Sequence, residues 1–295
     1  MKAIIKITII GLLLGGIISA CSKPDASLPK DPILGLGGDS WVAGDIDVWI
    51  EKEFILPYNI EIKYKWDPYE FNYLKNMVPV KEEKVELVMT AVKDIWIKPY
   101  ENVIDANFIK RFAPKQFVIG GSAEWNNDGT IKLGEAEGGR KIVLLVVNEF
   151  DPNNVNGIKQ MLRTMHHEFA HILHQHILFP QAWRNFNPEW YTATWYNNED
   201  ADAHRQGLVT AYAKLSADED FVETIATLLV DGQEFFNAII AKNDVPANSK
   251  RILREKEAMV VEYFAKNYQI DFRKLQVETQ LAIKKFIADH TKPKK

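Results

Sequence analysis

The 295-residue chain contains a single cysteine, Cys21, so no disulfide framework can support its fold. It has no block of basic residues apart from the final "KPKK", and its formal net charge is −4. We therefore expect no nucleic-acid partner, because binding to a phosphate backbone needs a basic surface. No repeat of fixed period is present, which argues against a repeat architecture. The composition, 46% apolar and 26% charged, is typical of a globular protein with a sizeable core.

The main apolar run lies at the N-terminus. "MKAIIKITIIGLLLGGIISAC" has two lysines, about a dozen apolar residues and then small residues that end at Cys21, which is typical of an export signal. The run is short and interrupted by glycine, whereas a membrane span needs about 20 apolar residues. "ISAC" resembles the bacterial lipobox, in which the cysteine becomes the lipidated first residue; the alternative is an ordinary signal peptide with a chance cysteine. We expect a signal peptide over residues 1–20 and a lipid-anchored mature protein.

The rest of the chain divides by composition and periodicity. Residues 21–40 are rich in proline, glycine and serine and predict a flexible tether, whereas residues 41–290 contain no further linker and predict one domain. The first part of that domain, residues 41–178, mixes helical periodicity with short strands, including the apolar run "RKIVLLVVNEF" at residues 140–150. The second part, residues 179–290, is mostly helical. The sequence thus predicts an α+β fold with a mixed-sheet upper lobe and a helical lower lobe.

Five of the seven histidines lie in "TMHHEFAHILHQHILF", residues 164–179. Apolar residues recur at helical spacing from Ile158 to about Leu178, so this segment predicts a helix that follows the strand. On a helix, His167 and His171 point within about 40° of each other and lie about one turn apart. Both imidazoles can therefore bind one metal ion.

Glu168 completes a recognised arrangement. It points about 60° to the side of His171, where its carboxylate can face a water molecule at the metal. "HEFAH" thus matches His-Glu-x-x-His, in which two histidines bind zinc and the glutamate is the general base of a hydrolase. The alternative is a helix whose histidines have this spacing by coincidence. We expect His174 to be a core residue or a partner of a ligand, and His166 and His176 to be ordinary polar positions on the helix.

A catalytic zinc site needs a third protein ligand. "SADEDFVETIATLLV" begins at the capping residue Ser216 and predicts a second helix, with Glu219 and Glu223 four apart on one face. Either carboxylate could bind the metal. A glutamate ligand followed one turn later by an acid that bonds a ligating histidine is typical of zinc sites, so we assign Glu219 to the metal and Glu223 to orienting that histidine. The alternative is two solvated acids that the helix dipole favours.

"HEFAH", followed about 48 residues later by "EDFVE" with "AYA" shortly before it, carries a family resemblance. Together with "ISAC" and "PYNIEIKYKW", these blocks resemble the zinc-binding metallopeptidase lipoproteins of Bacteroidetes over most of the chain; the genes of that family accompany TonB-dependent import systems. The chain is more distantly similar to lethal-factor-type gluzincins. The resemblance implies a zincin-like fold, a Zn²⁺ cofactor, a peptide or protein substrate, and an import complex as partner at the outer membrane.

The same resemblance implies roles for two residues. In gluzincins the residue that matches Glu219 binds zinc, and the tyrosine that matches Tyr212 lies at the catalytic centre. A phenol there could donate a hydrogen bond to the oxyanion of a tetrahedral intermediate; the alternative is a tyrosine that only packs. The resemblance implies a membrane-anchored zinc metallopeptidase. The rival hypothesis is a non-catalytic accessory or binding lipoprotein that retains the zinc site, but a purely structural site has no use for the base Glu168.

The segment between the two metal-binding helices is unusually aromatic. It holds seven aromatic residues between Phe179 and Tyr196. These side chains could form a wall for the substrate, or they could pack over the helices, and the sequence leaves both readings open.

The anchor gives a prediction that can be tested. Cys21→Ser should move the protein from the membrane fraction to the soluble fraction, because the lipid loses its attachment site. The variant should still fold, since the tether contributes no core residues. Fractionation of expressing cells followed by immunoblotting measures the distribution. Full retention of Cys21→Ser in the membrane fraction would show that the anchor lies elsewhere.

Overall fold

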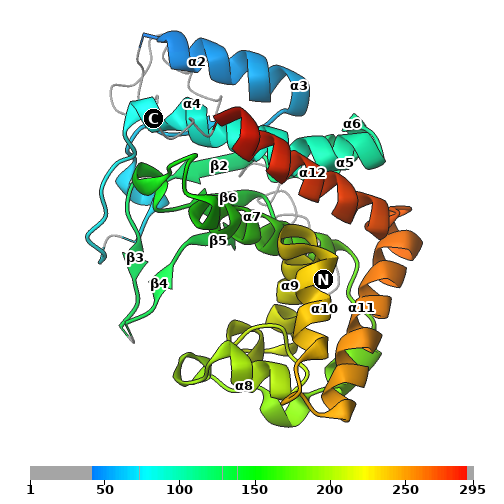
Figure 1. The fold of residues 1–295 in the computed structure, drawn as a ribbon. Coiled ribbons are helices and arrows are strands. Elements are labelled where there is room, and N and C mark those ends of the chain that lie inside the picture. The colour runs from blue at the N-terminus through cyan, green and yellow to red at the C-terminus, as the bar shows by residue number, and fades with distance from the viewer. Residues whose placement is uncertain (1–41, 73, 128, 138, 291–295) are drawn as a thin grey trace, which may run out of the picture. The chain divides into compact units, whose positions relative to one another are not determined.

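The computed structural model describes residues 42–72, 74–127, 129–137 and 139–290 (Figure 1). The signal peptide, the lipidation site Cys21 and the tether that we predicted lie outside these residues. The chain divides into two units, Met1–Ala43 and Gly44–Lys295, and the second contains all the elements described below. Among the helices of the described segments, none combines the length and the apolar character that a membrane crossing requires.

A four-stranded mixed sheet lies at the centre of the upper lobe (Figure 1). Its strands, in spatial order, are β1 (Glu61–Lys63), β2 (Gln116–Ile119), β6 (Lys141–Leu144) and β5 (Gly134–Glu137). The first three run parallel, and β5 runs antiparallel to β6. After their first residues, Gln116 and Lys141, β2 and β6 are apolar because both of their faces are covered. Val118 and Val143 pack in a small cluster on the face away from the main core. β5 carries two glutamates and forms one edge of the sheet.

The strand that we predicted over residues 140–150 is shorter than expected. Only Lys141–Leu144 pair with neighbouring strands, and the next residues form the 3₁₀ turn η5 (Val147–Glu149). Val146 lies between them with φ of 63°, a left-handed conformation that β-branched residues seldom adopt. The chain therefore leaves the sheet early and turns towards the start of the next helix.

Helices and one hairpin complete the upper lobe. The helical segments that precede β2 are α2 (Asp45–Ile50), η2 (Glu51–Ile55), α3 (Leu56–Tyr58), η3 (Pro68–Glu70), α4 (Glu82–Ala91), η4 (Val92–Ile97), α5 (Lys98–Val103) and α6 (Ala106–Phe112). The segments from α4 to α5 run on without a break and bury Trp96 against the sheet residue Phe117. β3 (Glu124–Trp125) and β4 (Ile131–Lys132) form a hairpin that extends away from the sheet (Figure 1).

Helix α7 (Val155–His176) is the histidine-bearing helix that the sequence predicts, although it begins and ends slightly earlier than expected. Asn154 caps it, since its side-chain oxygen accepts a hydrogen bond from the Gly157 N–H at 3.0 Å. One face is buried, and its Phe169 meets Trp96 and Tyr100 edge to face, with ring centroids 5.0 and 5.2 Å apart. The opposite face remains available for the site.

The second half of the chain is helical. Its elements are η6 (Gln181–Asn185), η7 (Pro188–Trp190), η8 (Trp195–Asn197), α8 (Asp200–Arg205), η9 (Tyr212–Lys214), α9 (Ala217–Ala226), η10 (Thr227–Asp231), α10 (Gly232–Ala241), α11 (Ala247–Tyr268) and α12 (Phe272–His290). α9 packs directly on α7, and α12 returns to the upper lobe to contact α5 and η4. The α+β fold predicted from the sequence is confirmed.

A buried ion pair fixes α9 to α11. Lys256 Nζ lies 2.6 Å from Asp220 Oδ2, and both side chains are fully buried. The same carboxylate oxygen accepts hydrogen bonds from Trp183 Nε1 at 3.1 Å and from the Tyr191 hydroxyl at 3.0 Å, and Lys256 also donates to the Gly207 carbonyl. Breaking a buried pair on one side costs about 3–5 kcal/mol, so this network holds α9 firmly in place. It also shows that part of the aromatic segment serves packing.

Candidate metal centre

The contact between α7 and α9 brings three of the predicted ligands together. His167 Nε2 lies 3.1 Å from His171 Nε2 and 3.0 Å from Glu219 Oε2, and His171 Nε2 lies 3.4 Å from the same oxygen. Within the described part of the chain, these residues form the group of histidines and acids that could hold a metal ion. His167 and His171 are one turn apart on α7, and Glu219 faces them from the first turn of α9, which Ser216 caps.

The three residues fit a zinc ion. Zinc binds histidine nitrogen and carboxylate oxygen at about 2.0–2.2 Å in a tetrahedron, which places neighbouring ligand atoms about 3.4 Å apart. The three distances above are close to this spacing. Glu219 Oε2 is buried and receives no hydrogen bond of good geometry, although it lies within ion-pair distance of both imidazoles. A cation at the point where the three side chains converge satisfies that oxygen and both nitrogens.

Glu223 orients the first of the two histidines. Its Oε1 lies 2.8 Å from His167 Nδ1, and its Oε2 accepts a hydrogen bond from the Thr210 hydroxyl at 2.7 Å. A proton on Nδ1 that is donated to Glu223 leaves the Nε2 lone pair directed at the metal position. Thr210 itself is held because it accepts a hydrogen bond from the Ala213 N–H at 3.1 Å. A series of hydrogen bonds from Ala213 through Thr210 and Glu223 therefore holds the ligand His167 in place.

His174 orients the second ligand. Its Nε2 lies 3.1 Å from His171 Nδ1, and its ring is buried against Phe179. His174 is not part of the ligand group, so it acts on the metal only through His171. The expectation that His166 is an ordinary polar position is wrong: it is buried, its Nδ1 lies 3.3 Å from the Tyr100 hydroxyl, and burial lowers its pKa to about 3. His176 is exposed at the end of the helix.

The charges around the ligands couple metal binding to pH. Burial lowers the pKa of His167, but hydrogen bonds to Glu219 and Glu223 outweigh it and raise that pKa to about 10. For Glu219, burial raises the pKa, yet His167 and His171 outweigh it and hold the pKa well below its usual range. The carboxylates that stabilise a proton on His167 also stabilise a divalent cation at the same position. Zinc must therefore displace that proton when it binds, so its affinity depends on pH.

Glu168 and Tyr212 lie beside the ligands without belonging to them. Glu168 is buried, which raises the pKa of its carboxyl group although both nearby histidines oppose the shift. The Tyr212 ring packs 5.7 Å from the His167 ring and 4.8 Å from the Trp195 ring, centroid to centroid. Burial, reinforced by Glu219 and Glu168, raises the pKa of Tyr212. Its phenol therefore stays protonated at neutral pH and can donate a hydrogen bond.

These groups line a cleft of about 610 Å³. Its lining comes from β5 and the β3–β4 hairpin, from α7, and from Trp195 and Tyr212. Trp195 is thus the member of the aromatic segment that faces the cleft, whereas Trp183 and Tyr191 pack around Asp220. The sequence left open whether this aromatic segment packs or borders the site. Part of the segment packs, and Trp195, near its C-terminal end, lines the cleft.

Arg163 was not anticipated from the sequence. It lines the cleft, and its Nε lies 2.6 Å from Asp231 Oδ2, to which its Nη2 also bonds. It stands four residues before His167, so helical spacing alone places it on the face of the ligands. Thr210 was missed too, and no local pattern marks it, because its contact with Glu223 depends on how two segments pack.

Two comparisons with known proteins bear on the site. A family model described as a putative zinc-binding metallo-peptidase matches residues 39–273. A crystal structure of a putative zinc-binding metallo-peptidase from Bacteroides caccae is similar, with 30% sequence identity and a TM-score of 0.70. The similarity covers 85% of this chain and 99% of that one. No curated protein matches the chain. Both findings support zinc as the cofactor of this centre, where His167, His171 and Glu219 could bind the ion.

The ligand set predicts the metal content of two variants. The purified mature protein should hold about one zinc ion per chain, and His171→Ala should lose it, since two protein ligands make a poor zinc site. His176→Ala is the matched control, because His176 lies on the same helix outside the ligand group, and it should keep its zinc. Inductively coupled plasma mass spectrometry measures the content. Full zinc occupancy in His171→Ala would refute the assignment.

Proposed function

The chain belongs to the family of putative zinc-binding metallo-peptidases, and we propose that it hydrolyses peptide bonds with Glu168 as general base and Tyr212 as donor to the oxyanion. The observation that carries this proposal is the position of Glu168. It is buried in the cleft next to both histidine ligands, yet it is not itself among the ligands. A zinc site that served structure alone would need no such carboxylate.

The roles of the side chains follow from their surroundings. When bound by His167, His171 and Glu219, zinc supplies Lewis-acid chemistry, which makes water nucleophilic near neutral pH and polarises a carbonyl group. Glu168 takes the proton of the attacking water as its oxygen bonds to the carbonyl carbon, and then gives that proton to the amine nitrogen as the C–N bond breaks. The Tyr212 phenol donates a hydrogen bond to the carbonyl oxygen as negative charge develops there.

The edge of the sheet supports a peptide as the substrate. Hydrogen bonds show which backbone groups of this segment point towards β6. The Leu145 N–H donates to the carbonyl of Leu133, which directly precedes β5, and the Arg140 N–H donates to the carbonyl of Glu137 at the end of β5. By the alternation of antiparallel pairs, the backbone groups of Gly134 and Ala136 face the other way, towards the free edge, where the Ala136 N–H also bonds to the Glu168 carboxylate. β5 also lines the cleft, so an extended peptide could add to this edge beside the ligands.

Gly134 allows this edge to lie close to the active helix. A Cβ atom at position 134 would lie 2.5 Å from Thr164 Cγ2 on α7, far inside van der Waals contact. With glycine there, β5 and α7 come close together at this point of the cleft lining. The backbone of β5 is thereby held next to the helix that carries the ligands.

Anchoring and partnership form a further part of the proposal. We propose that the mature chain is attached to the outer membrane through Cys21 and acts beside a TonB-dependent import complex. The lipobox-like "ISAC" and the family resemblance support this. The second candidate function is that of an accessory lipoprotein of such a complex without catalysis, and the buried base Glu168 favours the enzyme over it.

Glu168→Gln separates these two functions. The variant keeps the size of the side chain and should keep its zinc, but it removes the base, so peptidase activity should fall by about 10² to 10⁴. Tyr212→Phe removes only the hydroxyl, and kcat should fall by about 10² with KM little changed, because the bond forms in the transition state. Cleavage of a mixed peptide library that a chelator blocks, read by mass spectrometry, provides the assay.

Glu135→Gln is the matched control for this assay. Glu135 also lines the cleft, but it is exposed on β5 and pairs with Lys132, so its loss should leave the rate within a few-fold of wild type. Wild-type turnover in Glu168→Gln would refute the mechanism. If the zinc-loaded wild type cut no peptide at all, the accessory function would be supported in its place.

A further inference from the structure

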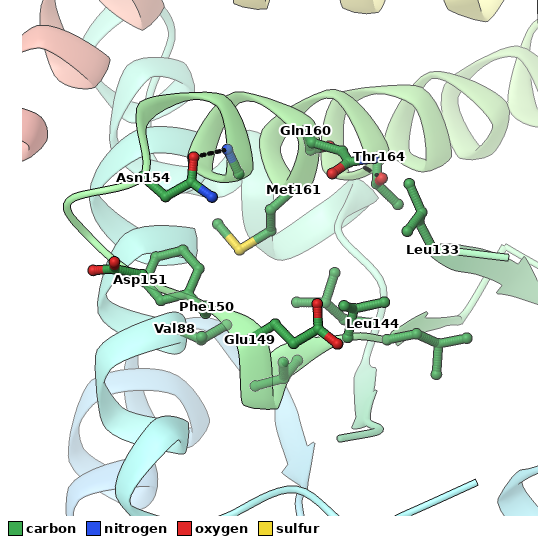
Figure 2. Close-up of a pocket in the computed structure, with 14 residues that line it drawn as sticks. Val88, Leu133, Leu144, Glu149, Phe150, Asp151, Asn154, Gln160, Met161 and Thr164 are labelled. Atoms are coloured by element: carbon green, nitrogen blue, oxygen red, sulfur yellow. Dashed lines mark hydrogen bonds between the residues drawn. The ribbon is translucent and has the colours of Figure 1, made fainter. Parts of the chain in front are cut away.

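A second cavity adjoins the metal cleft along the N-terminal half of α7. It measures about 120 Å³ and is lined by α7, η5, the end of β6 and Val88 of α4 (Figure 2). We call it the α7 cavity. Leu133, Gln160 and Thr164 line both this cavity and the cleft, so the two hollows share a wall. Thr164 precedes His167 by three residues, which is about 4.5 Å along the helix axis. The shared wall therefore lies within one helical turn of the first ligand, and the cavity extends from there towards Asn154 at the start of α7.

The walls of the α7 cavity are largely apolar. Leu144, Val147 and Phe150 are buried and line it, and the Met161 side chain points into it from α7 (Figure 2). An apolar cavity of about 150 Å³ in another protein holds a benzene molecule, so about 120 Å³ is the size of one long side chain. The cavity can thus receive one residue of an extended peptide that lies on β5.

One charged group is directed into this cavity. Figure 2 shows the Glu149 carboxylate and the Met161 side chain pointing towards each other from opposite sides. In the described part of the chain the Glu149 carboxylate has no hydrogen bond or ion pair, although the backbone N–H of Glu149 donates to the Val146 carbonyl. The cavity lining contains no lysine or arginine. The nearby Lys84 donates instead to the Phe150 carbonyl at 2.8 Å. The other acid of the lining, Asp151, is engaged by the backbone and side chain of Asn153.

We propose that the α7 cavity is a substrate subsite for a lysine or arginine side chain next to the cleaved bond, an inference that rests on the proposed peptidase function. The aliphatic stem packs against Met161 and Leu144, and the cationic end reaches Glu149. Because Glu149 is exposed, the ion pair contributes at most about a five-fold preference, and apolar contact supplies the rest of the binding. The subsite therefore selects for length first and for positive charge second.

Cleavage kinetics test the charge. In the library digest, cut sites of the wild type should be enriched in lysine or arginine at one position beside the bond. For a peptide with lysine there, Glu149→Gln should lower kcat/KM about five-fold, whereas the matched norleucine peptide should be unaffected. Glu83→Gln removes the same charge from α4 outside the cavity and should change neither rate. An enrichment that persists unchanged in Glu149→Gln would overturn the assignment of Glu149.

A second variant tests the cavity itself. Met161→Phe fills part of the hollow, so it should slow cleavage of both the lysine and the norleucine peptides by about ten-fold or more, while a peptide with alanine at that position is cut as before. Zinc content and melting temperature equal to those of the wild type show that the variant is folded. Equal slowing of the alanine peptide would overturn the proposal, because the change would then affect the reaction and not the subsite.

A binding measurement separates failure of this inference from failure of the peptidase function. The zinc-loaded mature protein, which begins at Cys21, is labelled with ¹³C at its five methionine methyl groups, and Met161→Leu assigns the Met161 signal. Nα-acetyl-arginine amide should shift that signal and bind about five-fold more tightly than Nα-acetyl-norleucine amide, a difference that Glu149→Gln should abolish. Equal binding of the two probes, or no shift with either, would overturn the proposal. A normal shift with no peptide cleaved would refute the peptidase function alone.

Discussion

The packing of α9 on α7 is the contact on which the site depends. It places Glu219 Oε2 3.0 Å from His167 Nε2 and Glu223 Oε1 2.8 Å from the Nδ1 of the same ring. α9 begins more than 40 residues after α7 ends, yet its two glutamates contact both nitrogens of the His167 imidazole on α7. On its other side, α9 is held by the buried pair of Asp220 with Lys256. Glu219 and Asp220 are adjacent, so the anchor and the ligand are parts of one rigid turn.

This arrangement gathers carboxylates that repel one another. Glu168, Glu219 and Glu223 all lie on the same small buried site, where removal from water strengthens their repulsion. The histidines offset part of that charge, and a divalent cation offsets more of it. Metal binding therefore stabilises the native fold as well as enabling chemistry. The same carboxylates, together with burial, keep Tyr212 protonated. Burial also raises the pKa of Glu168 above its ordinary value, although His167 and His171 oppose this shift.

Local spacing was enough to predict the main helices and the pairing of His167 with His171, because ligands one turn apart follow from helix geometry. Glu219 lies on another helix, and its assignment came from the pattern of a glutamate followed one turn later by an acid and from the family resemblance. His166 was misjudged although the signal was present: it lies four residues after the buried Leu162, on the apolar face. The bond between His171 and His174, the series of hydrogen bonds through Thr210 and the α7 cavity required the structure. Each depends on side-chain direction or on packing between segments that no single-helix pattern describes. The central strand β6 ended early because Val146 adopts a left-handed conformation, which sequence periodicity does not indicate.

The central claim is that one zinc ion is held by His167, His171 and Glu219. Anomalous diffraction at the zinc absorption edge, recorded from crystals of the zinc-loaded protein, tests it most directly. The account predicts one strong peak at about 2.0–2.2 Å from the Nε2 atoms of both histidines and from a carboxylate oxygen of Glu219. A peak coordinated by His174 in place of Glu219, or a strong peak away from the α7–α9 contact with none at this position, would contradict it.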